Sequence, residues 1–218
     1  MTTYKLLYFR IRNLAEVTRL LFKLAEQPFD DCIVEFDKWP QIKGKVPFRL
    51  LPVLEVTDSN GTVQIAQSKA ILRFVASRLG LDGSNDIERA QCDMIVEQIR
   101  DIFDKLVSVY KLPDSEEKNQ RLTNALSDTI PNAYKLIQNI LEENKNGNGF
   151  LVGNKVSYAD VALMNSYDWL LNRKHEVLSR LSGLENHDKM MRNIPQLARH
   201  LEENKNLNLT ILYNISYP

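Results

Sequence analysis

The 218-residue sequence is short of several features that would each point to a particular class of protein. Its two cysteines, Cys32 and Cys92, lie far apart, so the sequence offers neither a disulfide framework nor a C-x-x-C metal or redox pair. No apolar run approaches the roughly 18 residues that a membrane-spanning helix needs. Residues 1–12 lack the apolar core and cleavage site of a secretion signal. We therefore expect a globular protein of the cytoplasm with no membrane partner.

Net charge is also absent, because 28 Lys and Arg are balanced by 28 Asp and Glu. This balance disfavours a dedicated nucleic-acid-binding protein. The charges are unevenly distributed, however: residues 1–80 carry 12 basic and 8 acidic side chains, a surplus of four positive charges. Such a surplus suits an anionic small ligand in this part of the chain, and it is equally compatible with random scatter of surface charge.

The pattern of apolar residues in the first 80 positions predicts alternating strands and helices. Short strands are expected at residues 4–9, 31–36, 53–56 and 62–65. Amphipathic helices are expected around residues 17–24 and 71–79, and Gly80 ends the second of them. The resulting order, βαβ, a loop and then ββα, indicates a compact α/β sheet domain.

Beyond Gly83 the strand signals disappear and helical spacing takes over. A helical seam is formed by Ile95, Ile99, Ile102, Leu106 and Val109. Further helices are expected over residues 122–140, with a kink at Pro131, after Ser157 and from Pro195. Ser157 and Asp160 have the spacing of a capping box. We predict an α/β domain at residues 1–80 and an all-helical domain at residues 81–218.

Five motifs, in both predicted domains and in the right order, resemble a cytosolic glutathione transferase. They are Tyr4-Lys-Leu-x-Tyr-Phe9, Leu14-Ala-Glu-x-x-Arg19, Leu51-Pro-Val-Leu-Glu-Val56, Ala66-Gln-Ser68 and Val152-Gly-Asn-x-x-Ser-Tyr-Ala-Asp160. The likeness is nearest to the tyrosine-using enzymes of the sigma class, with alpha- and pi-like features. It implies a thioredoxin-like domain followed by a helical-bundle domain, glutathione as co-substrate, and a homodimer.

In this family the first strand supplies the catalytic hydroxyl, and the resemblance assigns that role to Tyr8. A free thiol has a pKa near ~8.5, so only a few per cent is thiolate at neutral pH. Lowering the pKa by about two units requires about 2.7 kcal/mol of preferential anion stabilisation. A hydroxyl donor and the positive end of the helix near Leu14 supply part of this. The alternative is that Tyr8 is an ordinary core aromatic.

The resemblance also implies residues that hold the rest of glutathione. Gln67 and Ser68, at the start of a helix, would bind the γ-glutamyl carboxylate, although Ser68 could also be a plain N-cap. Leu51 and Pro52 match the cis-proline turn that presents backbone groups to the cysteinyl unit.

Three further positions match residues that bind the two ends of the tripeptide. Trp39 and Lys43 would hold the glycyl carboxylate, with Lys45 as a substitute for Lys43. Asp101 would reach the γ-glutamyl amine across a dimer. The alternatives are a packing role for Trp39 and exposed charges at Lys43 and Asp101.

Three departures from the family pattern affect the expected site. Leu14 stands where many relatives have an arginine beside the thiolate, and Arg10 or Arg12 are candidate replacements. Leu50 stands where Gln or Lys often contacts the peptide. Arg100, beside Asp101, would oppose a divalent cation, so we predict no metal.

The electrophile pocket is implied only by the resemblance. Its expected lining is Phe9, Ile11, Leu14, Asp104, Ser108 and Tyr213. The three histidines, His175, His187 and His200, have no metal-ligand spacing, and we expect them at the surface. Phe48 matches an aromatic residue that inserts into the other subunit of a dimer, the alternative being that its own chain covers it.

The sequence therefore predicts a homodimeric glutathione transferase that adds the glutathione thiolate to apolar electrophiles, with peroxidase or prostaglandin isomerase activity as options. The alternative is a non-enzymatic ligand-binding or crystallin-like protein on the same fold. A thioredoxin-type oxidoreductase is set aside because residues 10–13 contain no cysteine.

Overall fold

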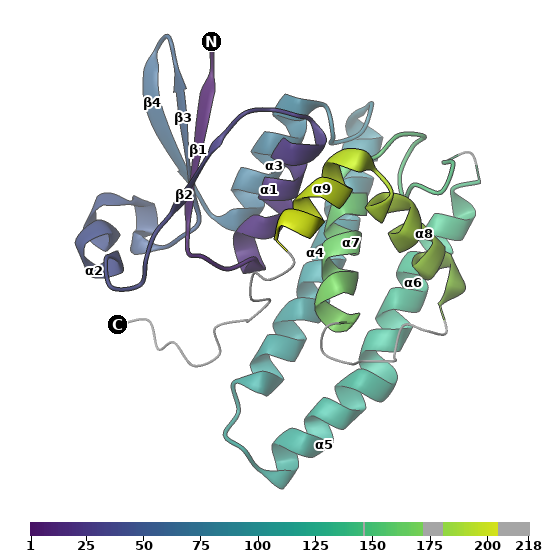
Figure 1. Ribbon diagram of the computed structural model, residues 1–218. Helices are drawn as coiled ribbons and strands as arrows, with labels where there is room; N and C mark the ends of the chain where they lie inside the picture. The colour runs from purple at the N-terminus through teal and green to yellow at the C-terminus, as the bar shows by residue number, and fades with distance from the viewer. Residues whose placement is uncertain (146, 172–180, 205–218) are drawn as a thin grey trace. The chain divides into compact units, whose positions relative to one another are not determined.

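The computed structural model describes residues 1–145, 147–171 and 181–204 (Figure 1). These residues form two compact units. One unit comprises residues 1–81 together with residues 194–204, and the other comprises residues 82–193. The chain therefore leaves the first unit near Leu81 and returns to it for its last described helix.

The first unit is built on a four-stranded mixed sheet. Its strands are β1 (Thr3–Tyr8), β2 (Asp30–Ile33), β3 (Val53–Asp58) and β4 (Gly61–Ala66), in the spatial order β2-β1-β3-β4. β2 runs parallel to β1, whereas β3 is antiparallel to both β1 and β4. One helical segment connects β1 to β2 and another connects β2 to β3. This order is the thioredoxin-like arrangement predicted from the sequence.

Helices cover the sheet of the first unit on both faces (Figure 1). α1 (Asn13–Leu24) and α3 (Ser68–Leu79) lie side by side on one face, and the short α2 (Trp39–Ile42) lies on the other. α9 (Pro195–Glu203) packs against α1 and begins at the predicted proline. α3 ends as predicted, because Gly80 takes the left-handed conformation (φ 68°) that lets Leu81 N–H bond to Ala76 O.

The second unit is helical throughout its described part. It contains α4 (Asp86–Tyr110), α5 (Glu116–Asn124), a π-helical turn (Ala125–Thr129), α6 (Ile130–Glu143), α7 (Tyr158–Leu171) and α8 (Ser182–Arg192). The predicted seam of α4 is buried at Ile95, Ile99, Ile102 and Leu106, and α4 packs against α7. The π-helical turn lies just before Pro131, where the sequence predicts a kink.

The predicted capping box at the start of α7 is confirmed in one half and altered in the other. The Asp160 carboxylate accepts hydrogen bonds from Ser157 N at 2.8 Å and from the Ser157 hydroxyl at 2.8 Å, so this hydroxyl donates to the carboxylate. The carboxylate also accepts from Leu151 N at 2.8 Å and bonds to His187 Nε2 at 2.9 Å. His187 is therefore buried, and the expected surface position was wrong.

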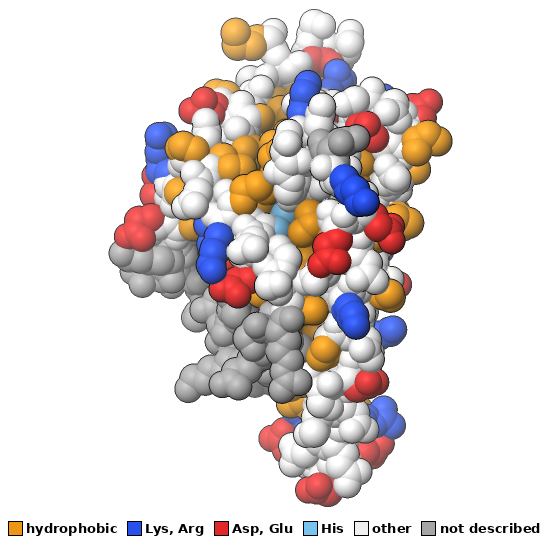
Figure 2. All heavy atoms as spheres, turned by 90° about the vertical axis from the view of Figure 1, so that its right-hand side faces the viewer, with side chains coloured by type: hydrophobic (Ala, Val, Ile, Leu, Met, Phe, Trp, Pro, Cys, Tyr) orange, Lys and Arg blue, Asp and Glu red, His pale blue; other side chains and the backbone are white. Residues whose placement is uncertain are grey.

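The surface agrees with the balanced composition. On the face drawn in Figure 2, basic and acidic side chains lie interspersed among polar ones, and neither sign forms a continuous field over the described residues. α4 is the longest helix of the described chain, yet neither it nor any other described helix is apolar enough to cross a bilayer.

Candidate functional site

The candidate site lies at one edge of the sheet, where four strand ends meet. β1 ends at Tyr8, which pairs with Ile33, the last residue of the parallel strand β2. β3 begins at Val53, which pairs on one side with Leu7 and on the other with Ala66, the last residue of β4. The strand register therefore brings together the segments that follow Tyr8, Ile33 and Ala66 and the turn that precedes Val53.

Tyr8 occupies the centre of this edge, because its strand is an inner one. Only 1% of its surface is exposed, and its backbone carbonyl accepts a hydrogen bond from Val34 N at 2.8 Å. The guanidinium of Arg19 lies over its ring, 5.8 Å from the ring centroid, a distance that favours a cation–π interaction.

The segment after β2 contributes an aromatic cluster. The Phe9 ring stacks on Phe36 with centroids 4.6 Å apart and meets the edge of Trp39 at 5.7 Å. Trp39 is 3% exposed, and its indole Nε1 has no hydrogen-bond partner among the described residues. Lys43 is half-buried in the next turn, whereas its substitute Lys45 is exposed. Trp39 thus carries a buried indole N–H that no described residue accepts.

The other two segments of the edge carry unusual backbone geometry. The Leu51–Pro52 peptide bond is cis, as the resemblance predicts, and both residues are buried. Gln67 has a φ of 73° and holds the N-cap position of α3 without a side-chain hydrogen bond to the helix. Ser68 is the first residue of α3, so the alternative of Ser68 as the N-cap is wrong. The first amides of α3 therefore lack a side-chain cap from Gln67.

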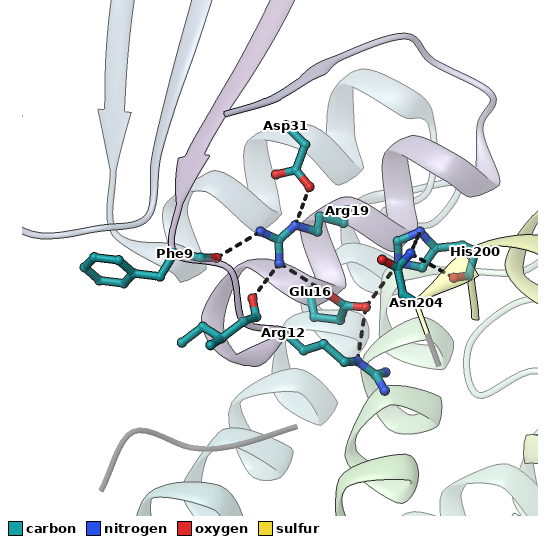
Figure 3. A network of polar contacts seen from close by, with 8 residues as sticks. Phe9, Arg12, Glu16, Arg19, Asp31, His200 and Asn204 are labelled. Carbon is teal, nitrogen blue, oxygen red and sulfur yellow. Dashed lines mark hydrogen bonds and ion pairs between the residues drawn. The ribbon is translucent and has the colours of Figure 1, made fainter. Parts of the chain in front are cut away.

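Next to Tyr8, a group of buried charges fixes the start of α1 (Figure 3). Arg19 donates from Nη1 to Ile11 O at 2.7 Å and from Nη2 to Phe9 O at 3.4 Å. Its Nε donates to Asp31 on β2 at 2.9 Å. Arg19 thus ties together the end of β1, the segment after it and the neighbouring strand.

Glu16 is the acidic centre of this group and is 1% exposed. It accepts from Arg12 Nε at 3.2 Å and from Arg19 Nη1 at 3.4 Å, and it bonds to His200 Nε2 of α9 at 3.1 Å. Burial acts to raise the pKa of Glu16, but the hydrogen bond to His200 and the charges of Arg12, His200 and Arg19 outweigh it, so the pKa lies below its usual value.

Sequence reasoning missed this group of residues. Glu16 and Arg19 belong to a motif that carried the family resemblance, and that motif was the available signal. No sequence signal pointed to His200, because its partner, Glu16, lies 184 residues away in the chain. The expected surface position of His200 was wrong, since the residue is 5% exposed, and His175 lies outside the described residues.

The candidate replacements for an arginine at position 14 are both engaged elsewhere. Arg10 is exposed and pairs with Glu35 at 3.0 Å. Arg12 is buried and pairs with Glu16. Leu14 itself is half-buried in the first turn of α1, and Leu50 is 48% exposed.

The remaining predicted positions fall on α4, at the turn before β3, or outside the described residues. Asp101, Asp104 and Ser108 are exposed along α4, and Asp104 forms a two-bond ion pair with Arg100 at 2.9 and 3.0 Å. Tyr213 lies outside the described residues. Within residues 1–145, 147–171 and 181–204, no cluster of His, Cys, Asp or Glu is arranged to hold a metal ion.

Phe48 is strongly exposed. Its side chain lies on a turn of 3₁₀ helix with φ 56°, and 74% of its surface is accessible. The alternative, in which its own chain covers Phe48, is therefore wrong. A large apolar side chain presented in this way is available to a partner.

Comparison with known proteins agrees with this geometry. The family model described as "Glutathione S-transferase, C-terminal domain" matches residues 100–204. The chain is 33% identical over 204 residues to the class-mu 28 kDa glutathione S-transferase isozyme of Schistosoma japonicum, a match that covers 91% of this chain and 97% of the relative.

Two solved structures of the same kind are also similar to this chain. The pi-class glutathione S-transferase of Onchocerca volvulus superposes with a TM-score of 0.82 at 29% identity, covering 96% of this chain and 98% of the other. The sigma-class enzyme of Fasciola hepatica gives a TM-score of 0.81 at 25% identity, covering 93% and 96%. Sequence and fold agree over nearly the whole length, and the chain belongs to the glutathione S-transferase family of enzymes.

Proposed function

We propose that this enzyme binds glutathione at the edge of its sheet, holds the sulfur as a thiolate with the hydroxyl of Tyr8, and adds it to apolar electrophiles. The observation that carries the proposal is the strand register, which gathers Tyr8, the cis turn at Leu51–Pro52 and the start of α3 at one edge. These are the segments that the family resemblance assigns to glutathione.

Each part of the tripeptide has a complementary group at this edge. The backbone of Leu51 can pair with the cysteinyl unit in the manner of an added strand. The uncapped amides of α3, with Gln67 and Ser68, suit the γ-glutamyl carboxylate because a helix N-terminus favours an anion. The unsatisfied indole N–H of Trp39 and the ammonium of Lys43 suit the glycyl carboxylate.

Because position 14 holds leucine and not arginine, fewer groups are available to stabilise the thiolate. The phenol of Tyr8 can donate to the sulfur, and a hydrogen bond to a charged acceptor is worth about 1.5–3 kcal/mol. The N-terminus of α1 adds about 0.3–1 kcal/mol. Arg19, held over the Tyr8 ring, makes the phenol a better donor to an anion.

We also propose that the enzyme is a homodimer of the cytoplasm. The exposed ring of Phe48 supports a partner subunit, and in that arrangement Asp101 would reach the γ-glutamyl amine of the other site. Replacing Phe48 with Asp should shift the mass measured by light scattering from that of a dimer to that of a monomer. An unchanged mass would remove Phe48 from the interface.

The central test is Tyr8→Phe, assayed by conjugation of glutathione to chloro-dinitrobenzene. Affinity for glutathione should be nearly unchanged, and turnover should fall tenfold or more, which corresponds to a loss of about 1.4 kcal/mol. Tyr4→Phe is the matched control, because Tyr4 lies on the same strand with its ring packed on Phe22 at 5.3 Å, and it should keep its turnover. An unchanged rate in Tyr8→Phe would move thiolate activation to another group.

The same measurements decide between an enzyme and a binding protein. Retention on glutathione-agarose without any conjugation would favour a ligand-binding or crystallin-like role. Peroxidase and prostaglandin isomerase reactions use the same thiolate, so both should also fall in Tyr8→Phe if they are present.

A further inference from the structure

The hydrogen bonds around His200 hold its ring in place. Asn204 Nδ2 donates to the backbone carbonyl of His200 at 2.9 Å and lies 3.2 Å from its Nδ1. On the other side of the ring, Nε2–H donates to the Glu16 carboxylate, which can only accept, at 3.1 Å.

His200 joins a group of paired charges at the start of α1. Arg12 and Arg19 both pair with Glu16, Arg19 also pairs with Asp31, and the three residues on α1 and at its N-cap are buried (Figure 3). His200 supplies Glu16 with one further hydrogen-bond donor. Its helix, α9, packs against α1 within the same unit.

Arg19 has short bonds to Ile11 O at 2.7 Å and to Asp31 at 2.9 Å, whereas its other two contacts leave little tolerance. Arg19 Nη1 lies 3.4 Å from Glu16 Oε2, and Arg19 Nη2 lies 3.4 Å from Phe9 O. Both distances are at the upper limit of a hydrogen bond, so a shift of a few tenths of an ångström would break them. Without His200, the Glu16 carboxylate keeps Arg12 and Arg19 as donors and is drawn toward Arg12, because its Oε1 then bonds to that side chain alone.

We propose that His200 is a positioning residue: by holding Glu16 it fixes Arg19, and Arg19 fixes the backbone of Phe9 and Ile11 that follows Tyr8. The inference rests on the proposed function of Tyr8 for its catalytic consequence. Residues 9–11 are anchored to Arg19 by two carbonyls, and Ile11 N bonds back to Phe9 O at 2.7 Å. A displaced Arg19 would therefore change the direction of the Tyr8 hydroxyl.

The test compares four variants of the full-length chain. His200→Phe keeps a ring of similar size and removes the donor, whereas His200→Gln places an amide nitrogen near the position of Nε2. Asn204→Ala leaves Nε2 in place but removes the side chain that contacts His200 on its other side, and it decides the question if His200→Phe does not fold. Arg199→Ala is the matched control, because Arg199 is exposed on the same helix.

Hydrogen exchange, followed by mass spectrometry of peptides covering residues 8–13, reports the positioning without any ligand. Exchange there should accelerate in His200→Phe and, to a smaller extent, in Asn204→Ala. It should stay at the wild-type rate in His200→Gln and Arg199→Ala. Folded His200→Phe and Asn204→Ala proteins with wild-type exchange in this segment would overturn the proposal.

The catalytic readout is the pKa of bound glutathione, measured from the ultraviolet absorbance of its thiolate. In His200→Phe this pKa should rise by about one unit and kcat should fall about tenfold, while KM for glutathione changes less than about threefold. His200→Gln should restore both values. A loss of kcat without a change in thiol pKa or exchange would reduce His200 to a purely structural role.

The two proposals fail in different ways. If the wild-type chain does not lower the pKa of glutathione, the proposed function of Tyr8 fails. The exchange rates of residues 8–13 still decide whether His200 positions the segment. If Tyr8→Phe loses turnover and His200→Phe behaves as wild type in every readout, only the role of His200 is refuted.

Discussion

Removing the carboxylate of Asp160 should destabilise the helical unit severely. This side chain is fully buried and accepts from Leu151 N, Ser157 N, the Ser157 hydroxyl and His187 Nε2. In Asp160→Ala the hydroxyl can rotate to another acceptor. A change of tautomer would not satisfy His187, because its Nδ1 is already buried without a partner among the described residues. The two backbone amides cannot turn at all, so they are left without partners in a buried site and set the minimum cost.

The cost follows from these two amides. Leaving a buried donor unsatisfied costs about 1–3 kcal/mol, so the pair should lower the free energy of unfolding by about 4 kcal/mol. For a chain of this size that corresponds to a fall in Tm of about 8–16 °C. Asp160→Asn keeps one acceptor oxygen, which can serve Ser157 N, so it should leave only Leu151 N unpaired and cost about 2 kcal/mol.

The assay is urea denaturation followed by circular dichroism, with hydrogen exchange in α7 to show which unit unfolds. Asp128→Ala is the control, since Asp128 is exposed and its carboxylate accepts a hydrogen bond from the exposed side chain of Asn132 at 2.9 Å. It should change the stability by less than about 0.5 kcal/mol. A loss below about 1 kcal/mol in Asp160→Ala would refute the assignment of two orphaned amides.

Two further predictions concern buried groups of known pKa direction. The pKa of Glu16 lies below its ordinary value of 4.5, so its carboxylate stabilises the folded state above pH 4.5, and this contribution is lost as the pH falls through the lowered pKa. Glu16→Gln should therefore be less stable than wild type at neutral pH and lose less stability on acidification in urea titrations; parallel acid limbs would contradict this. Burial raises the pKa of Cys92 to about 11, so iodoacetamide at neutral pH should label the partly exposed Cys32 and spare Cys92, as peptide mass spectrometry can check. Equal labelling of a folded sample would be the contrary result.

The strands and most helices could be predicted because short-range patterns determine them. The stripe on α4 repeats every three or four residues and the glycine after α3 acts within one turn of helix, and both were found where the sequence placed them. α8 was missed because its buried face contains His187 and Asp188 beside Leu184 and Met191. A face that mixes charged and apolar residues gives a weak apolar period.

The residues of the candidate site could also be predicted only in part. The motifs identified the residues at the sheet edge, and the strand register supplies the reason why they converge. The motif that contains Glu16 and Arg19 was a signal that these residues matter, but it does not show what they contact, and charged side chains are mostly exposed. Arg19 bonds to Asp31 and Glu16 bonds to His200, and these contacts form only when the chain has folded.

The return of residues 194–204 to the first unit has a consequence for biosynthesis. A ribosome finishes the four strands long before it makes α9, whose Leu197 and His200 complete the packing beside α1. Nascent domains generally fold from the amino terminus onward. Here the described part of the helical unit, residues 82–193, is synthesised as one uninterrupted stretch. The packing of the sheet unit beside α1 can be completed only after the ribosome has made α9.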